Sequence, residues 1–130
     1  MAKEPPPDTG FGPLLGISMD ERLEGGSLCS LEVGPQHLNP HGVLHGSVMF
    51  ALTDQGMGAA VYSLLEPDQL CATIESKIVF IAAVRGGRVE CRSRVISQGK
   101  RVAILESDVT SEGRLVARAL GSYAMFTPSA

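Results

Sequence analysis

The chain has 130 residues, 44% hydrophobic and 19% charged, which indicates one globular domain and argues against an intrinsically disordered protein. Its net charge of −3, its lack of tryptophan and its 5% aromatic content argue against a general nucleic-acid binder. Residues 1–76 hold two basic and ten acidic side chains, a sum of −8, whereas residues 77–130 hold nine basic and four acidic, a sum of +5. The basic half either attracts a phosphorylated small ligand or solvates the outer faces of strands.

The cysteines and the apolar segments indicate where in the cell the protein is expected and whether it spans a membrane. Cys29, Cys71 and Cys91 have no motif spacing, and the start of the chain lacks the apolar core of a signal peptide, so we expect reduced thiols in a cytoplasmic protein. Residues 46–65 are long enough to span a membrane. However, Asp54 and Gln55 lie at their centre and no basic flank follows, so we predict a buried helix and no membrane partner.

The first third of the chain is predicted to be irregular apart from one strand. Residues 1–13 contain four prolines and are expected to form a flexible N-terminal tail, which leaves 14–130 as the domain. Residues 14–24 fit either a short helix or a first strand. Residues 27–33 alternate as a strand does, and the prolines and glycine of 34–44 indicate a loop.

One helix and a run of strands make up the rest. The helix is predicted over 46–65 and ends before Pro67, with a slim face of glycine and alanine (Ala51, Gly56, Gly58, Ala59, Ala60) that allows close packing on a sheet. Strands are expected over 72–84, 88–97, 102–110 and 115–126, joined by tight turns as an antiparallel meander. The predicted class is α+β, with a long central helix wrapped by a curved antiparallel sheet.

Asp54 is the strongest candidate for chemistry. A carboxylate inside an apolar helix costs several kcal/mol unless it is paired, hydrogen-bonded or protonated. It is therefore either a functional group or a structural carboxylate that is hydrogen-bonded to a strand.

The start of the same helix is a second candidate. His45-Gly46 places free N–H groups and the positive end of the helix dipole where a carbonyl oxygen could bind, although His45 and Asn39 could instead only cap the helix and brace the loop. Asp54 lies eight residues after Gly46, about 12 Å along the axis, so both can act on one atom only if two subunits contribute. The spacing of His37, His41 and His45 is that of a helical metal site, but Pro40 and Gly42 oppose a helix there, and no metal is expected.

The pattern of Asn39, His45-Gly46-Ser47 and Asp54, followed by a glycine- and alanine-rich helix, resembles the hotdog-fold acyl-CoA thioesterases. The resemblance covers roughly residues 14–126. It is strongest to the branch that includes the phenylacetate-pathway thioesterases and human thioesterase superfamily member two. It implies hydrolysis of a thioester without a cofactor, by a homodimer or by a dimer of dimers that makes a homotetramer.

The resemblance also implies roles for individual residues. The Gly46 N–H would polarise the thioester carbonyl, and Asn39 would help to hold that carbonyl. His45 would have a positioning role. Asp54 of the partner subunit would activate water or attack directly, and Thr73 would support the water. Coenzyme A phosphates would be met by Lys100 and Arg101, with Arg85 as a weaker candidate. Ser47 departs from the pattern, because the family usually has a second glycine there.

We therefore expect an acyl-CoA thioesterase that acts on an acyl- or aryl-acyl-CoA. Two alternatives stay open: a hotdog hydratase or dehydratase of acyl thioesters, and a non-catalytic acyl-CoA-binding module. The acyl group is not fixed by the sequence. Candidates to line its pocket are Met49, Met57, Tyr62 and Phe80, although for each one taken singly a place in the ordinary core is the stronger expectation.

Overall fold

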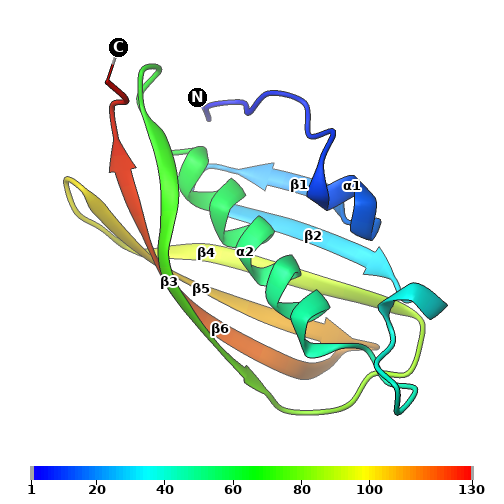
Figure 1. Cartoon of the computed structure of the whole chain (residues 1–130). Coiled ribbons are helices and arrows are strands. Elements are labelled where there is room, and N and C mark those ends of the chain that lie inside the picture. The colour runs from blue at the N-terminus through cyan, green and yellow to red at the C-terminus, as the bar shows by residue number, and fades with distance from the viewer. Residues whose placement is uncertain (1, 130) are drawn as a thin grey trace.

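The computed structural model describes residues 2–129, in which a curved six-stranded antiparallel sheet wraps around one long helix (Figure 1). The sheet order is β1-β2-β4-β5-β6-β3. The elements are α1 (Phe11–Leu15), β1 (Ser18–Leu23), β2 (Gly26–Glu32), η1 (Pro35–His37), α2 (Gly46–Tyr62), β3 (Leu70–Phe80), β4 (Arg88–Gln98), β5 (Val102–Ser111) and β6 (Arg114–Phe126). The predicted α+β arrangement is confirmed. No helix among the described residues is both long and apolar enough to cross a bilayer.

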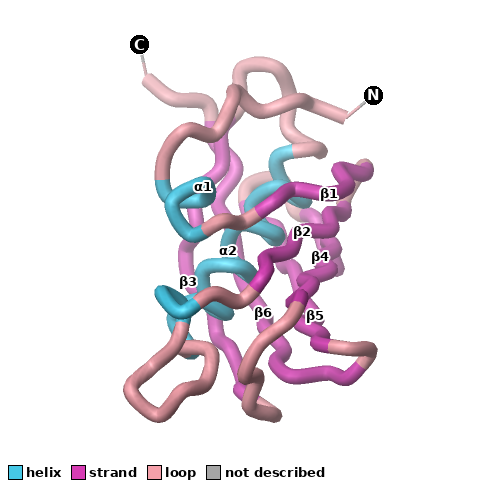
Figure 2. The backbone as a smooth tube through the Cα atoms, turned by 90° about the vertical axis from the view of Figure 1, so that its right-hand side faces the viewer, coloured by secondary structure: helices cyan, strands magenta, loops and turns pink. Residues whose placement is uncertain are grey.

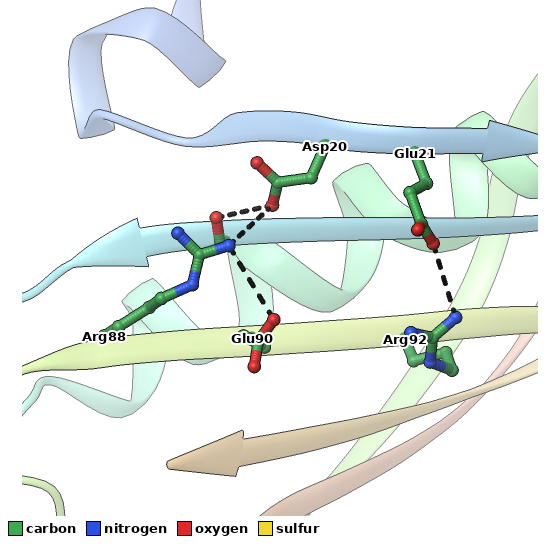
Figure 3. Close-up of polar contacts among 6 residues, drawn as sticks. Asp20, Glu21, Arg88, Glu90 and Arg92 are labelled. Atoms are coloured by element: carbon green, nitrogen blue, oxygen red, sulfur yellow. Dashed lines mark hydrogen bonds and ion pairs between the residues drawn. The ribbon is translucent and has the colours of Figure 1, made fainter. Parts of the chain in front are cut away.

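Alternation along the strands separates a buried inner face from a charged outer face. In β4, Val89 and Cys91 are buried against α2, while Arg92 and its outward neighbours are exposed. Arg88 and Arg92 pair with acidic side chains of β1, at 3.3 Å to Asp20 and 3.6 Å to Glu21 (Figure 3). Arg94 and Arg118 pair with carboxylates of β5. These four arginines of residues 77–130 therefore form the solvent-facing outer surface of the sheet. Exposed ion pairs of this kind contribute little to stability.

The predicted meander is correct for β4, β5 and β6 but wrong for β3. β3 pairs with β6, not with β4, and lies at the edge of the sheet. The second side of β4 is taken by β2, with Cys29 opposite Cys91. Residues 81–87 therefore do not form a hairpin but cross the end of the sheet. They are fixed there by the bonds Ile81 N to Val116 O, at 2.8 Å, and Leu44 N to Val84 O, at 2.7 Å.

The long helix α2 ends at Tyr62, one turn before the predicted end. The Ser63 hydroxyl donates to Ala60 O at 2.7 Å, and the Leu65 N–H donates to Tyr62 O at 3.1 Å. The second bond joins residues three apart, as in a 3-10 turn, instead of the four of an α-helix, so the α-helix ends here. Figure 2, turned by 90°, shows α2 enclosed between β3 on one side and the β2–β4 side of the sheet on the other. The helix is thus buried along most of its length.

The slim face of α2 is present at Gly56. A Cβ built there would lie 2.5 Å from Ser93 Oγ and 3.3 Å from Cys29 Sγ, so only glycine allows the helix this close to β2 and β4. Ala51 and Ala60 are also buried, whereas a Cβ on Gly58 would meet no atom within 4 Å. Close packing of α2 on the sheet therefore depends on Gly56 and not on Gly58.

The N-terminal region contains both elements that the sequence left open. The chain is helical from Phe11 in α1 and then enters β1. Before α1, the Lys3 N–H donates to Ser63 O at 3.2 Å, so residues preceding the helix lie against the C-terminal end of α2. The domain boundary at residue 14 stays a prediction.

Candidate functional site

The Asp54 carboxylate is held by two hydroxyl donors. Thr73 Oγ of β3 donates to Oδ1 at 2.8 Å, and Tyr123 OH of β6 donates to the same oxygen at 2.7 Å. Thr73 and Tyr123 are direct partners in the β3–β6 register, so the two strands present their hydroxyls side by side to α2. Both bonds end on Oδ1, and a carboxylate held in this way has a fixed orientation towards any group that approaches Oδ2.

Tyr123 is a site residue that the sequence analysis missed. Its side chain is 2% exposed, and burial is the largest cause that raises its pKa, followed by the hydrogen bond to Asp54 and the charge of Asp54. The phenol therefore stays protonated and remains a donor. The available signal was its position: Tyr123 is a polar aromatic residue on the inward face of β6, between Gly121 and Met125, which are buried too.

A cavity of about 380 Å³ lies beside Asp54. It is lined by residues of the N-terminal segment, of β1, of α2, of the start of β3 and of β6, namely Pro5, Pro6, Asp8, Met19, Arg22, Asp54, Gln55, Gly58, Ala59, Tyr62, Cys71, Ala72, Thr73 and Tyr123. Of the proposed pocket residues, Tyr62 lines this cavity, whereas Met57 is fully buried in the core. The lining is mixed, because apolar surface from Pro5, Pro6, Met19 and Ala59 lies beside the polar groups of Asp8, Arg22 and Gln55.

The start of α2 forms a second concave region. His45 is the N-cap, and its Nδ1 accepts the Ser47 N–H at 3.0 Å and lies 2.7 Å from Ser47 Oγ. The Phe80 ring packs so closely on Gly46 that a Cβ there would lie 2.8 Å from Cζ. An open hollow of about 480 Å³ borders Gly46, Met49 and Phe80. His45 therefore caps the helix. The Gly46 N–H, at the first position of the helix, has no acceptor within the helix.

Asn39 and His37 shape the loop that leads to this helix start. Asn39 Oδ1 accepts the backbone N–H of His41 at 2.9 Å, and the Asn39 N–H donates to Val43 O at 2.8 Å. The buried His37 ring accepts the Gly34 N–H at Nδ1 and contacts Leu15 O through Nε2 at 2.7 Å. Within residues 2–129, no group of three or more His, Cys, Asp or Glu side chains is arranged to hold a metal ion.

The predicted residues therefore fall into two groups within one protomer. Asp54 and Thr73 are brought together near the middle of α2, whereas Asn39, His45 and Gly46 gather at its start. About 12 Å of helix separates Gly46 from Asp54. One protomer alone does not place the carboxylate and the Gly46 N–H around a common atom.

The comparison with known proteins adds the family. Residues 41–117 match the family described as the thioesterase superfamily, which is more than half of the chain. This chain belongs to the thioesterase superfamily. It has the hotdog fold of that family and is a thioester hydrolase, as the resemblance had led us to expect.

Three relatives illustrate the match to this thioesterase. The structure of conserved protein PA5202 from Pseudomonas aeruginosa is 32% identical, with a TM-score of 0.88 over 92% of this chain and 95% of that one. A variant of the phenylacetic acid degradation protein PaaI from Thermus thermophilus is 27% identical, with a TM-score of 0.82 over 88% and 96%. The 1,4-dihydroxy-2-naphthoyl-CoA hydrolase of Listeria monocytogenes is 26% identical over 79% of this chain and 84% of the hydrolase.

The basic residues predicted to meet coenzyme A are not together in one protomer of the thioesterase. Lys100 and Arg101 lie in the β4–β5 hairpin, whereas Arg85 lies in the β3–β4 connection. Since β4 runs from Arg88 to Gln98 between these loops, they stand at opposite ends of the sheet (Figure 1). Arg85 shares its end with Gly46, because its neighbour Val84 accepts the Leu44 N–H next to the helix start.

Proposed function

We propose that this thioesterase hydrolyses an acyl- or aryl-acyl-CoA to the free acid and coenzyme A. The observation that carries the proposal is the Asp54 carboxylate, held by Thr73 and Tyr123 at the edge of a cavity that combines apolar and polar surface. Aryl-acyl groups are included because one relative is named as a naphthoyl-CoA hydrolase and another as a phenylacetic acid degradation protein. No residue of the reaction calls for a metal or other cofactor.

The reaction needs a base or nucleophile and a donor to the carbonyl oxygen. Asp54 removes a proton from water, or attacks the carbonyl carbon itself, and negative charge then develops on the thioester oxygen. The Gly46 N–H at the positive end of α2 stabilises that charge. The C–S bond breaks, and coenzyme A leaves as its thiol after taking up a proton. Asn39 and His45 hold the loop and cap that position the N–H.

A homodimer built on β3 brings the two groups together. β3 is an edge strand with exposed apolar side chains, 56% for Ile74 and 52% for both Val79 and Phe80, so it offers free backbone groups and an apolar flank. Antiparallel pairing with a second copy about an axis between Ser76 and Lys77 puts Phe80 opposite Thr73 of the partner subunit.

The consequence for the site follows from contacts within each protomer. Phe80 packs on Gly46 and Thr73 bonds Asp54, so this register carries the Gly46 N–H of one protomer towards Asp54 of the partner subunit. The same pairing joins the Arg85 end of one protomer to the Lys100 and Arg101 end of the other. Both basic sets then serve the phosphates of coenzyme A, and two such dimers assemble as a dimer of dimers.

The test is thiol release from a panel of short-chain, long-chain and aromatic acyl-CoAs. Asp54→Asn should lower turnover of the best substrate by roughly a hundredfold or more, the range found for loss of a general base. Asp68→Asn, which removes an exposed carboxylate after α2, is the matched control, and both variants should melt close to the parent protein. Near-parental turnover by Asp54→Asn would remove Asp54 from the mechanism.

The same assay separates the alternatives. A hydratase or dehydratase changes the acyl chain without releasing thiol, and a binding module gives saturable binding without turnover. We also place the enzyme in the cytoplasm, because the free thiols of Cys29, Cys71 and Cys91 suit a reducing compartment.

A further inference from the structure

The N-terminal segment Lys3–Asp8, which we call the strap, forms one wall of the Asp54 cavity. Pro5, Pro6 and Asp8 line the cavity together with Asp54 and Tyr62. In Figures 1 and 2 the chain before α1 passes over the top of the molecule, from the end of α2 to α1. The strap therefore forms the part of the cavity wall that lies between the end of α2 and α1.

One end of the strap is anchored by Lys3. Its ammonium donates to three carbonyl oxygens of the loop after α2, at 3.3 Å to Glu66, 3.3 Å to Pro67 and 2.5 Å to Gln69. It also lies 4.7 Å from the centre of the Tyr62 ring, a cation–π contact. A single side chain thus ties the strap both to the loop and to a residue of the cavity wall.

The other end is anchored by Asp8. Its Oδ1 accepts the Gly10 N–H at 3.1 Å, and its Oδ2 lies so close to Gly12 that a side chain there would collide with it. Gly12 in turn packs against the Gln55 side chain of α2, one residue after Asp54. The strap is therefore held at both ends.

Between the anchors the chain is stiffened by consecutive prolines. The ring of proline fixes φ near −65°, so Pro5 and Pro6 hold an extended conformation with little entropy left to lose. A wall of this kind keeps its position when a substrate presses on it. A flexible segment would move away.

We propose that the strap sets the largest acyl group that the Asp54 cavity admits, with Lys3 as its positioning residue. The occupant is the acyl or aryl part of the thioester and not the phosphates of coenzyme A. Pro5, Pro6, Met19 and Ala59 offer it apolar surface, and the two carboxylates of the lining, Asp8 and Asp54, outnumber its one cation, Arg22, and so disfavour an anion. This assignment of the acyl group rests on the proposed function. The position of the wall does not.

Cys71 gives a test of the wall that needs no catalysis. It lines the cavity, whereas Cys29 and Cys91 are 0% exposed in the core. Its thiolate attacks a methanethiosulfonate, forms a mixed disulfide and releases methanesulfinate. Labelling rates for a methyl and a benzyl reagent are compared in the parent protein and in Pro5→Gly/Pro6→Gly.

The ratio of the two rates is the informative quantity. Burial raises the pKa of Cys71 and the Lys3 charge lowers it, so variants at Lys3 change the thiolate fraction for both reagents alike. The benzyl-to-methyl ratio should rise by roughly tenfold in the double variant. One extra methylene in a tight apolar pocket has an effect of this size. Lys3→Met should raise it likewise, and Lys3→Arg, which keeps donors for the carbonyls, should restore it. Pro128→Gly, outside the strap, is the control for the substitution itself.

Turnover then connects the wall to specificity. In Pro5→Gly/Pro6→Gly and in Lys3→Met, kcat/KM for bulky aryl-acyl-CoAs should rise relative to acetyl-CoA. An unchanged labelling ratio in both folded variants would overturn the strap as a wall, and a changed labelling ratio with unchanged acyl preference would overturn its role in specificity. If the labelling ratio changes but no protein releases thiol from any acyl-CoA, the proposed function fails and the wall stands.

Discussion

At the scale of single residues, the site depends on how an apolar helix tolerates a carboxylate. The two hydroxyls that reach Asp54 Oδ1 compensate for its removal from water, at 2.8 Å from Thr73 and 2.7 Å from Tyr123. The same bonds would serve a structural carboxylate. The cavity beside Asp54 supports the proposed catalytic role, because a purely structural carboxylate would not need one.

We expect Tyr123→Phe to lower kcat by about tenfold or more, because a hydrogen bond to a charged group contributes about 1.5–3 kcal/mol. The ring stays, so the core around it is kept. Steady-state kinetics on the parent, on Tyr123→Phe and on the same change in an Asp54→Asn background measure the effect. Since Tyr123 acts through Asp54, the change should cost almost nothing once Asp54 is replaced. Equal losses in both backgrounds would show that Tyr123 acts elsewhere.

At the scale of elements, α2 owes its position to one small residue. Gly56 lies over Ser93 and Cys29, where the sheet leaves no room for a methyl group, and the Ser27 hydroxyl donates to Gly56 O at 2.6 Å. The Ser93 hydroxyl is itself bonded to Ser107 at 2.6 Å, so it cannot move away freely. The helix is thereby fixed against β2 and β4, with Asp54 turned to β3 and β6.

Gly56→Ala should destabilise the protein by about 1–3 kcal/mol, the usual cost of overfilling a packed core. Gly58→Ala is the matched control on the same helix: its added methyl meets nothing within 4 Å, and alanine favours the helix by up to about 1 kcal/mol. Urea unfolding of both variants gives the two free energies. Equal effects of the two substitutions would contradict the close approach at Gly56.

Much of this arrangement could be read from the sequence because it depends on local pattern. The alternation that buries Val89 and exposes Arg92 places β4, and the apolar run with its proline stop places α2 to within one turn. The place of β3 could not be read in this way, since its own pattern is the same whether its neighbour is β4 or β6. Tyr123 was missed because its bond to Asp54 depends on where α2 crosses β6, and no local pattern gives that position.

At the scale of the whole molecule, β3 is an edge strand of the sheet with one side available for pairing. An edge strand with free backbone groups and exposed Ile74, Val79 and Phe80 invites pairing with another chain. The two parts of the proposed site, one at Gly46 and one at Asp54, adjoin this edge through Phe80 and Thr73, respectively. A symmetric pair would therefore hold two identical sites, each with one part from either protomer.

This arrangement predicts complementation between two inactive variants. Gly46→Pro removes the N–H at the first helical position, where proline is well tolerated. The atoms that the new side chain would meet are the far end of the Phe80 ring, which can shift. Asp54→Asn removes the carboxylate. When the two proteins are unfolded, mixed in equal amounts and refolded, about half of the dimers are mixed, and each has one intact site of two.

The mixture should therefore recover about a quarter of the parent activity, although each variant refolded alone stays inactive. The parent protein carried through the same refolding sets the scale, and thermal unfolding of each variant verifies its fold. If Gly46 and Asp54 instead served one site within a protomer, every site in the mixture would carry a defect and no activity would return. Recovery thus depends on a single point, that the carboxylate and the helix N–H around one thioester belong to different copies of the chain.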